Sequence, residues 1–376
     1  MEYAYQFFTG GFGADRDDRD AGAALVDLYR RMGPGDVIAG WRAPDGRYRV
    51  MAEIAHDAGR RLWLWLPVFS ELPESSGAAP SVSYKNVLQK GLSGFPGEDF
   101  KFVCPSDKKN IAIAYELYAR YFAKYDFDGV FLDKIRHASF AGGPENGLGC
   151  FCERCVAAYA ERGVDARAAA RLFEYDPAAF IPARVNDCAY RFEDAAADDF
   201  FRAKAGVVSE AVTSVVKMFS AIGLEAALDV FAPATAYFVG QDLGALGKIA
   251  SFIKPMFYRV TRAPAGLTYE LDALRAAYGP RADVIKALNK IWGTDDLCSD
   301  GAARSMLASL KNCGGVFRPG FEINVVKNIC ESSPGYAASS VSIIEDAGFD
   351  KTVLCWDLFG DTAANLRALS NTKGRL

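Results

Sequence analysis

The sequence has very little histidine and no long hydrophobic run. His56 and His137 are the only two histidines among 376 residues. A three-histidine zinc site is therefore excluded, and a histidine-dependent catalytic triad has at most two centres. We expect acid–base chemistry to come instead from the 47 Asp and Glu residues. No apolar run reaches the length of about 18 residues typical of a transmembrane helix, so no membrane partner is predicted.

An excess of basic charge is also missing. Lys and Arg total 43 against 47 Asp and Glu, which gives a formal net charge of −4. This balance does not favour nucleic acid as a partner. The first residues, Met1–Phe8, have neither the basic start nor the apolar core of a signal peptide. The cytoplasm is therefore the default expectation, although a secreted chain without its leader would look the same. The sequence leaves the oligomeric state open.

Short apolar runs alternate with amphipathic stretches along the whole chain. We predict eight strands, over 3–8, 36–41, 62–68, 130–133, 224–231, 252–258, 316–321 and 352–356. Nearly all of them are followed by a predicted helix. Such alternation implies a parallel sheet, and eight units imply closure into a (β/α)₈ barrel of the α/β class. We therefore predict one barrel domain over residues 1–376, with insertions of about 71–105 after strand three and 134–186 after strand four.

An open doubly wound sheet is the main alternative fold. It would carry a Gly-x-Gly-x-x-Gly turn after the first strand, and Thr9–Gly13 matches that motif poorly. Among the helices, Ser106 is predicted to cap one that runs to about Lys124, and a long helix is predicted over about 187–221. The segment 284–288 is ambiguous between strand and helix.

In a barrel of this kind, the chemistry lies at the C-terminal ends of the strands. The candidates that stand there are Trp41, Arg42, Glu71, Asp133, Arg136, His137, Asp229, Tyr258, Glu322, Asn324, Trp356 and Asp357. Paired carboxylates flanked by aromatic rings are what cleavage of a glycosidic bond requires. Many strand-end acids, however, only cap the next helix. Trp63 and Trp65 alternate with leucines and are both assigned to the core.

Asp133 stands out because a buried apolar strand leads directly to it, where a carboxylate is costly unless a polar group meets it. The segment 125–136, Tyr-Asp-Phe-Asp-Gly-Val-Phe-Leu-Asp-Lys-Ile-Arg, resembles the strand-four motif of barrel glycoside hydrolases. It is similar to that of the alpha-amylase superfamily and, more closely, to that of bacterial hypothetical glycoside hydrolase barrels. Further segments agree with the latter, namely Cys104–Ser106, Cys150–Cys155, Pro319–Ile323 and Val353–Asp357.

The resemblance implies a barrel fold, glycan substrates and Asp133 as the nucleophile, and it leaves the acid open. The alpha-amylase group has a glutamate after strand five, where this chain has Asp229. In the clan whose pair stands on strands four and seven, Glu322 would serve, although that clan has a glutamate at strand four.

We therefore expect a retaining glycoside hydrolase for a small glycan. Asp133 would attack, and Glu322, or failing that Asp229, would act as acid and base. The remaining strand-end candidates would bind the sugar through its hydroxyls, its ring faces or an acidic group. No cofactor is expected for catalysis. The alternatives are a metal-assisted lyase or isomerase on the same barrel, and a catalytically silent carbohydrate-binding barrel.

The nine cysteines form one dense cluster and a scattered set. Cys150, Cys152 and Cys155 have spacing that suits a structural zinc site. A fourth ligand would come from Cys104, Cys188 or His137. Free thiols, disulfide-forming thiols or a catalytic thiol are the alternatives. The cysteines outside the cluster are predicted to be reduced; they are Cys104, Cys188, Cys298, Cys313, Cys330 and Cys355.

Overall fold

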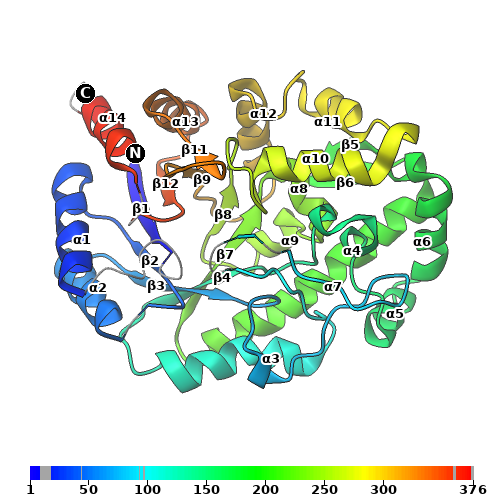
Figure 1. Cartoon of the computed structure of the whole chain (residues 1–376), viewed down its shortest axis with the longest axis horizontal. Coiled ribbons are helices and arrows are strands. Elements are labelled where there is room, and N and C mark those ends of the chain that lie inside the picture. The colour runs from blue at the N-terminus through cyan, green and yellow to red at the C-terminus, as the bar shows by residue number, and fades with distance from the viewer. Residues whose placement is uncertain (9–17, 44, 93, 96–97, 359–360, 374–376) are drawn as a thin grey trace.

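Eight parallel strands close into a barrel, as the alternation predicts. The computed structural model describes residues 1–8, 18–43, 45–92, 94–95, 98–358 and 361–373; the segment Thr9–Gly13 lies outside them. The barrel strands are β1 (Glu2–Phe7), β2 (Val37–Gly40), β3 (Leu62–Pro67), β4 (Gly129–Asp133), β7 (Glu225–Phe231), β8 (Ile253–Met256), β9 (Gly320–Glu322) and β12 (Lys351–Cys355). Closure comes from β1, which pairs with both β2 and β12, so the first and last strands lie side by side (Figure 1).

Helices surround this barrel. Those that follow barrel strands directly or after a loop are α1 (Asp18–Met32), α2 (Asp45–Asp57), α3 (Lys108–Leu117), α7 (Ala195–Ser220), α8 (Pro233–Ala236), α9 (Leu243–Gly247), α10 (Leu267–Tyr278), α11 (Val284–Trp292), α12 (Asp300–Leu310), α13 (Pro334–Asp346) and α14 (Ala363–Lys373). The ambiguous segment 284–288 is thus helical. Asp107, rather than Ser106, caps α3, because its side chain accepts a hydrogen bond from the Lys109 N–H.

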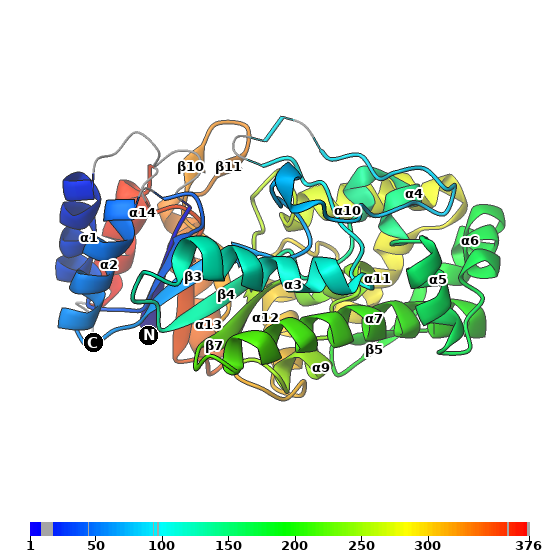
Figure 2. The ribbon, with the colours of Figure 1, turned by 90° about the horizontal axis from the view of Figure 1, so that it is seen from below.

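Two long insertions extend the barrel on one side. The first lies between β3 and α3, and the second lies between β4 and α7. The second contains α4 (Pro144–Gly147), α5 (Glu153–Ala160), α6 (Ala166–Tyr175) and the hairpin of β5 (Pro182–Asn186) with β6 (Ala189–Phe192). In both views α5 and α6 lie at the end of the molecule far from α1 and α2 (Figures 1 and 2). A smaller hairpin joins β10 (Val325–Val326) to β11 (Cys330–Glu331).

The predicted helix over 187–221 is wrong at its start. Residues 189–192 form β6, and the helix begins only at Ala195, with Asp194 as its N-cap. The residues just before Asp194 therefore belong to the hairpin of the second insertion. The helical pattern of α7 conceals this hairpin, because aromatic residues of β6 pack against the same core as the helix: Phe192 stacks on Phe201 with ring centroids 4.8 Å apart.

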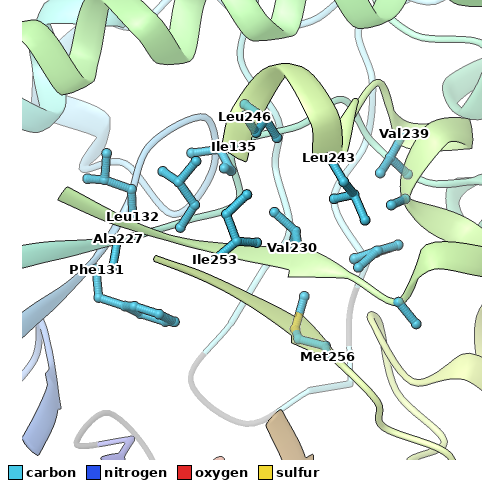
Figure 3. Packing of buried hydrophobic residues seen from close by; sticks show 14 of the residues in the cluster. Phe131, Leu132, Ile135, Ala227, Val230, Val239, Leu243, Leu246, Ile253 and Met256 are labelled. Atoms are coloured by element: carbon cyan, nitrogen blue, oxygen red, sulfur yellow. The ribbon is translucent and has the colours of Figure 1, made fainter. Parts of the chain in front are cut away.

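The core is divided by the alternation of side chains along the strands. In Figure 3, Val230 on β7 and Ile253 on β8 point toward Leu243 and Leu246 of α9, whereas Phe131 and Met256 lie on the other side of the strands. That other side is the barrel interior. Side chains alternate along a strand, so residues two positions from Phe131 or Met256, and residues next to Val230, also face the interior. This places Asp133, Asp229 and Lys254 on the inner face.

Candidate active site

Two carboxylates meet at the C-terminal mouth of the barrel. The register of the parallel strands pairs Leu132 of β4 with Leu228 of β7. The next residues, Asp133 and Asp229, therefore stand side by side on adjacent strands, which lie about 4.8 Å apart in a sheet. Both side chains line the same cavity, although only 8% of Asp133 and 1% of Asp229 are exposed. We call it the mouth cavity.

The mouth cavity holds about 790 Å³ of empty space, open solvent included. Its wall is mainly aromatic and apolar, and a few charged side chains interrupt it. The aromatic residues that line it are Phe8, Trp65, Phe95, Phe100, Phe231, Tyr258 and Trp356. The charged residues that line it are Glu98, Asp133, Lys134, Arg136 and Asp229. A concave apolar site with few placed polar groups is the usual form of a small-molecule site.

Asp133 is fixed by two N–H donors. Its Oδ2 accepts a hydrogen bond of 2.9 Å from the indole Nε1 of Trp65, and its Oδ1 accepts one of 2.5 Å from the backbone N–H of Lys134. Lys134 has a φ of 53°, a conformation that non-glycine residues rarely adopt. Both oxygens of Asp133 therefore have defined directions, and the donors suit a negatively charged carboxylate.

Asp229 has a different environment. Its Oδ2 accepts a hydrogen bond of 2.9 Å from Lys254 Nζ, while its Oδ1 has no hydrogen-bond partner among the described residues. Burial and, to a smaller extent, the charge of Asp133 raise the pKa of Asp229 to about 7, against the opposing effect of Lys254. Asp229 therefore keeps its proton close to neutral pH. Two neighbouring carboxyls whose environments differ in this way suit an acid and a nucleophile.

Lys254 links Asp229 to the rest of the barrel interior. Besides Asp229, its ammonium donates hydrogen bonds to Gln6 Oε1 at 3.0 Å and to the hydroxyl of Tyr258 at 2.8 Å. The side chain is fully buried. The pKa of Lys254 is nevertheless raised, because its interactions with neighbouring acidic groups, with Asp229 foremost, outweigh burial. Its partners come from three different strands or loops, so the lysine holds Asp229 in place.

Glu71 anchors the first insertion rather than facing the mouth cavity. Its carboxylate accepts hydrogen bonds from the backbone N–H groups of Asp99 and Phe100, and it lies 3.1 Å from Lys134 Nζ. Lys134 also contacts Glu98 Oε1 at 2.6 Å. Glu71 lines a neighbouring side cavity together with Trp41 and Arg42. The three residues predicted from strands two and three thus lie beside the mouth cavity, not in it.

Glu322 is also placed away from the mouth cavity. Its Oε1 accepts hydrogen bonds from the backbone N–H groups of Val260 and Thr261, and its Oε2 accepts one of 2.6 Å from the hydroxyl of Tyr336. Burial raises the pKa of Glu322 to about 7. Its oxygens are occupied in holding the loop after β8 against α13. The placement favours Asp229 over Glu322 as the partner of Asp133.

Three further predicted ligands have structural contacts. His137 is buried, its backbone N–H donates to Val239 O at 3.0 Å, and it does not line the mouth cavity. The side-chain amide of Asn324 donates a hydrogen bond to the carbonyl oxygen of Asp357 and accepts hydrogen bonds from the backbone N–H groups of Trp356 and Asp357. Asp357 is fully buried and is likewise absent from the cavity wall. Arg136, Tyr258 and Trp356 do line the cavity.

Several site residues were missed from the sequence. The sequence assigns Trp65 to the core, but its indole N–H donates a hydrogen bond to Asp133 and its side chain lines the mouth cavity. The pairing of Trp65 with Phe131 puts it on the inner face. Since β3 is apolar on both faces, its sequence does not indicate which set points inward. Phe95, Glu98 and Phe100 come from the first insertion, whose sequence has no periodicity from which a position could be predicted.

The cysteine cluster unites the two insertions. Cys104, Cys150, Cys152 and Cys155 place their sulfur atoms within 4.8 Å of one another. The Sγ of Cys104 is 3.3 Å from that of Cys152 and 3.4 Å from that of Cys155. Four thiolates around a tetrahedral Zn²⁺ at 2.3 Å would be about 3.8 Å apart. The residues present therefore fit a metal ion, and Cys104 is the fourth member.

Two cysteines outside the cluster are not reduced thiols. Cys188 and Cys313 form a disulfide, and their Cα atoms are 6.3 Å apart. The prediction of reduced thiols is therefore wrong for this pair, because the hairpin of the second insertion folds back onto the end of α12. Cys298, Cys330 and Cys355 are free. None of the helices in the described part of the chain is long and apolar enough to span a membrane.

Comparison with known proteins shows the fold but no close relative. No family model and no curated protein matches the chain. The fold is similar to that of the PgaB (BpsB) glycoside hydrolase domain from Bordetella bronchiseptica, with 14% identity, a TM-score of 0.63 and 98% of each chain covered. The catalytic domain of the Paenibacillus polymyxa beta-amylase has 12% identity and a TM-score of 0.55, with 98% of this chain and 97% of that chain covered.

The alpha-L-fucosidase isoenzyme 2 of Paenibacillus thiaminolyticus has 11% identity and a TM-score of 0.56; the match covers all of this chain and 49% of that one. These structural neighbours are glycoside hydrolases with distant sequences. The predicted resemblance to glycoside hydrolase barrels is thus confirmed for the fold.

Proposed function

We propose that the protein is a retaining glycoside hydrolase in which Asp133 is the nucleophile and Asp229 is the acid and base. The observation that carries the proposal is the placement of both carboxylates in register on adjacent strands, in one aromatic-walled cavity. The spacing of adjacent strands, about 4.8 Å, suits the separation of about 5 Å that a retaining pair needs.

The two environments suit the two roles. In the first step Asp133 attacks the anomeric carbon, while Asp229 gives its proton to the departing oxygen and becomes a carboxylate. In the second step Asp229 takes a proton from water, whose oxygen attacks the same carbon and releases Asp133. The raised pKa of Asp229, about 7, keeps the proton available at neutral pH. Lys254 faces the carboxylate that forms when this proton leaves.

The cavity wall supports a carbohydrate substrate. Aromatic rings provide faces for sugar rings, and Tyr258 and Trp356 stand on the wall with the two carboxylates. We take the substrate to be a small glycan or glycoside. The named glycoside hydrolases of similar fold favour this class over the metal-assisted lyase or isomerase and over the silent binding barrel, neither of which has a specific observation in its favour.

A leaving-group comparison tests the proposal. Wild type, Asp133→Asn, Asp229→Asn and Glu322→Gln are assayed on pairs of glycosides with one sugar and either a nitrophenolate or an alkyl leaving group. Asp133→Asn should remove turnover of both. Asp229→Asn should slow the alkyl glycoside by about 10²- to 10⁴-fold and the nitrophenyl glycoside much less, since nitrophenolate leaves without a proton.

Glu322→Gln is the matched control for the acid. If it shows the leaving-group dependence expected of Asp229→Asn, Glu322 is the acid instead. Full activity of Asp133→Asn would contradict the proposal altogether. Activity that disappears with a chelator and returns with Mg²⁺ or Mn²⁺ would indicate the metal-assisted alternative. Nuclear magnetic resonance of the first product tests retention, because the released sugar must keep the anomeric configuration of the substrate.

We also propose that the four clustered cysteines hold a structural Zn²⁺. The donor set is the closed one of structural sites, and no ligand is left for a substrate. The cluster joins the segment before α3 to the start of α5. The backbone adds a contact between the same insertions, since the Phe151 N–H donates to Val82 O at 2.7 Å. A bound zinc would therefore tie together the two insertions that wall the mouth cavity.

A further inference from the structure

Three cationic side chains surround the paired carboxylates, and two of them have acidic partners. Lys134 contacts Glu98 and Glu71, and Lys254 contacts Asp229. Arg136 is only 3% exposed, and no carboxylate of the described residues lies within 4.0 Å of it. Its one hydrogen bond within the described structure runs from Nη1 to the carbonyl oxygen of His137, at 2.9 Å.

Aromatic rings hold the Arg136 guanidinium in place. It lies 4.5 Å from the ring centre of Phe102 and 4.3 Å from that of Phe231. These contacts stack the planar group and fix its direction, but they do not supply an anion. Arg136 lines the mouth cavity. A stacked guanidinium at a cavity wall, with most of its N–H groups unused by the described residues, is built to receive acceptor atoms from a ligand.

Arg136 differs from the two lysines in how far nearby carboxylates offset the burial of its charge. Burial lowers the pKa of Arg136, and the more distant carboxylates of Glu270, Asp133, Glu98 and Asp229 do not reverse this effect. The pKa values of Lys134 and Lys254 are raised despite burial, because their partners more than compensate it. The protein thus compensates the desolvation of the two ammonium groups but not that of the guanidinium.

We infer that Arg136 binds a carboxylate of the substrate, so that the glycan carries an acidic sugar such as a uronic acid. The guanidinium fork matches a planar carboxylate in a bidentate pair. A monoanion balances the single charge of Arg136. A phosphate dianion would add further negative charge to a cavity that the carboxylate of Asp133 already lines. Asp133 and Arg136 both line the mouth cavity, so in this proposal one sugar ring presents its anomeric carbon to Asp133 and its carboxylate to Arg136.

This inference rests on the proposed function only for the position of the ring. Its test therefore uses binding rather than turnover. Isothermal titration calorimetry of the full chain compares methyl glucuronide with methyl glucoside, and methyl galacturonide with methyl galactoside. Glucose 6-sulfate and glucose 6-phosphate distinguish a carboxylate site from other anion sites. The variants are Arg136→Met, Arg136→Lys and, as a control, Arg304→Met, an exposed arginine on α12 that pairs with Asp346.

We expect a uronide to bind at least about 10-fold more tightly than its neutral analogue, the gain of one charged hydrogen-bond pair. Arg136→Met should remove this preference, Arg136→Lys should retain part of it, and Arg304→Met should leave it unchanged. Equal binding of acidic and neutral sugars by wild type would overturn the inference. Equal weakening of both by Arg136→Met, or a preference for the sulfate or phosphate, would overturn it as well.

Arg136→Lys keeps the test decisive if Arg136→Met does not fold. A neutral glycoside that is cleaved with dependence on Asp133, with no preference for uronides, would contradict the inference and leave the proposed function intact. Tight uronide binding without any turnover would support the inference about Arg136 and contradict the proposed hydrolase function.

Discussion

At the scale of single residues, the site separates two aspartates by their surroundings. Asp133 has two N–H donors, whereas Asp229 is buried with one oxygen unpartnered within the described structure and with a lysine on the other. The surroundings of Asp133 thus suit a charged carboxylate, and those of Asp229 suit a protonated one. The proposed chemistry needs no histidine, which agrees with the scarcity of this residue in the sequence.

The pH dependence of activity follows from Asp229. A general acid must be protonated, and the pKa of Asp229 is raised to about 7 by burial. We therefore expect kcat/KM to fall as pH rises through about 7, tenfold per pH unit above it. Measurement of kcat/KM from pH 5 to pH 9 on an alkyl glycoside tests this, and Asp229→Asn should abolish that alkaline limb. An unchanged alkaline limb in the variant would assign it to another group.

Trp65 is a positioning residue for Asp133. Trp65→Phe keeps an aromatic ring in the wall but removes the N–H that donates to Oδ2 at 2.9 Å. A hydrogen bond to a charged group is worth about 1.5–3 kcal/mol, so we expect kcat to fall by about 10- to 100-fold with KM changed little. Steady-state kinetics measure this split.

Trp63→Phe is the matched control on the same strand. Trp63 is buried, packs edge-on against Phe252 with ring centroids 5.1 Å apart, and its Nε1 has no hydrogen-bond partner within the described structure. Its replacement should lower the unfolding temperature and leave kcat nearly unchanged. Equal kinetic losses in the two variants would show that Trp65 acts through packing alone.

At the scale of elements, the barrel strands and the places of the insertions were predictable, but the structure within the insertions was not. All eight strands and the closure follow from apolar runs that alternate with helical patterns. The register of β4 with β7, and hence the pairing of Asp133 with Asp229, could be expected only once the fold was known. Glu322 shows the limit of strand-end reasoning: it ends β9 as predicted, yet the loop after β8 covers its oxygens. A strand's sequence does not show which backbone N–H groups of another loop will reach it.

The proposed zinc would fix the two insertions relative to each other, because its four cysteines come from both of them. Removal of one ligand, by Cys104→Ser, should release the zinc and lower the unfolding temperature by about 5 °C or more, because metal bound only by the folded state stabilises it. Cys298→Ser is the control, since Cys298 is a free thiol outside the cluster. Metal analysis and thermal unfolding are measured on the same preparations. Zinc in the Cys104→Ser protein at one ion per chain would contradict the proposed ligand set.

At the scale of the whole molecule, cysteines attach the second insertion to other parts of the chain at two places, in addition to its packing contacts. The cysteine cluster joins it to the first insertion, and the Cys188–Cys313 disulfide joins its hairpin to the end of α12. Lys134 and Arg136, which line the mouth cavity, lie in the chain between β4 and these attachments. The segment that supplies these two residues to the cavity is therefore followed by two cross-linking points within the same insertion.

The disulfide should contribute to global stability because it closes a long loop. Its two residues are 125 positions apart, and a loop of about this length corresponds to roughly 4–5 kcal/mol in the chain-entropy model. We expect the double variant Cys188→Ser/Cys313→Ser to unfold at lower urea concentration than wild type without reductant. A reductant should lower the wild-type midpoint toward that of the double variant and leave the variant's own midpoint unchanged. Equal midpoints without reductant would show that the pair stays reduced in solution, as the sequence and a cytoplasmic setting predict.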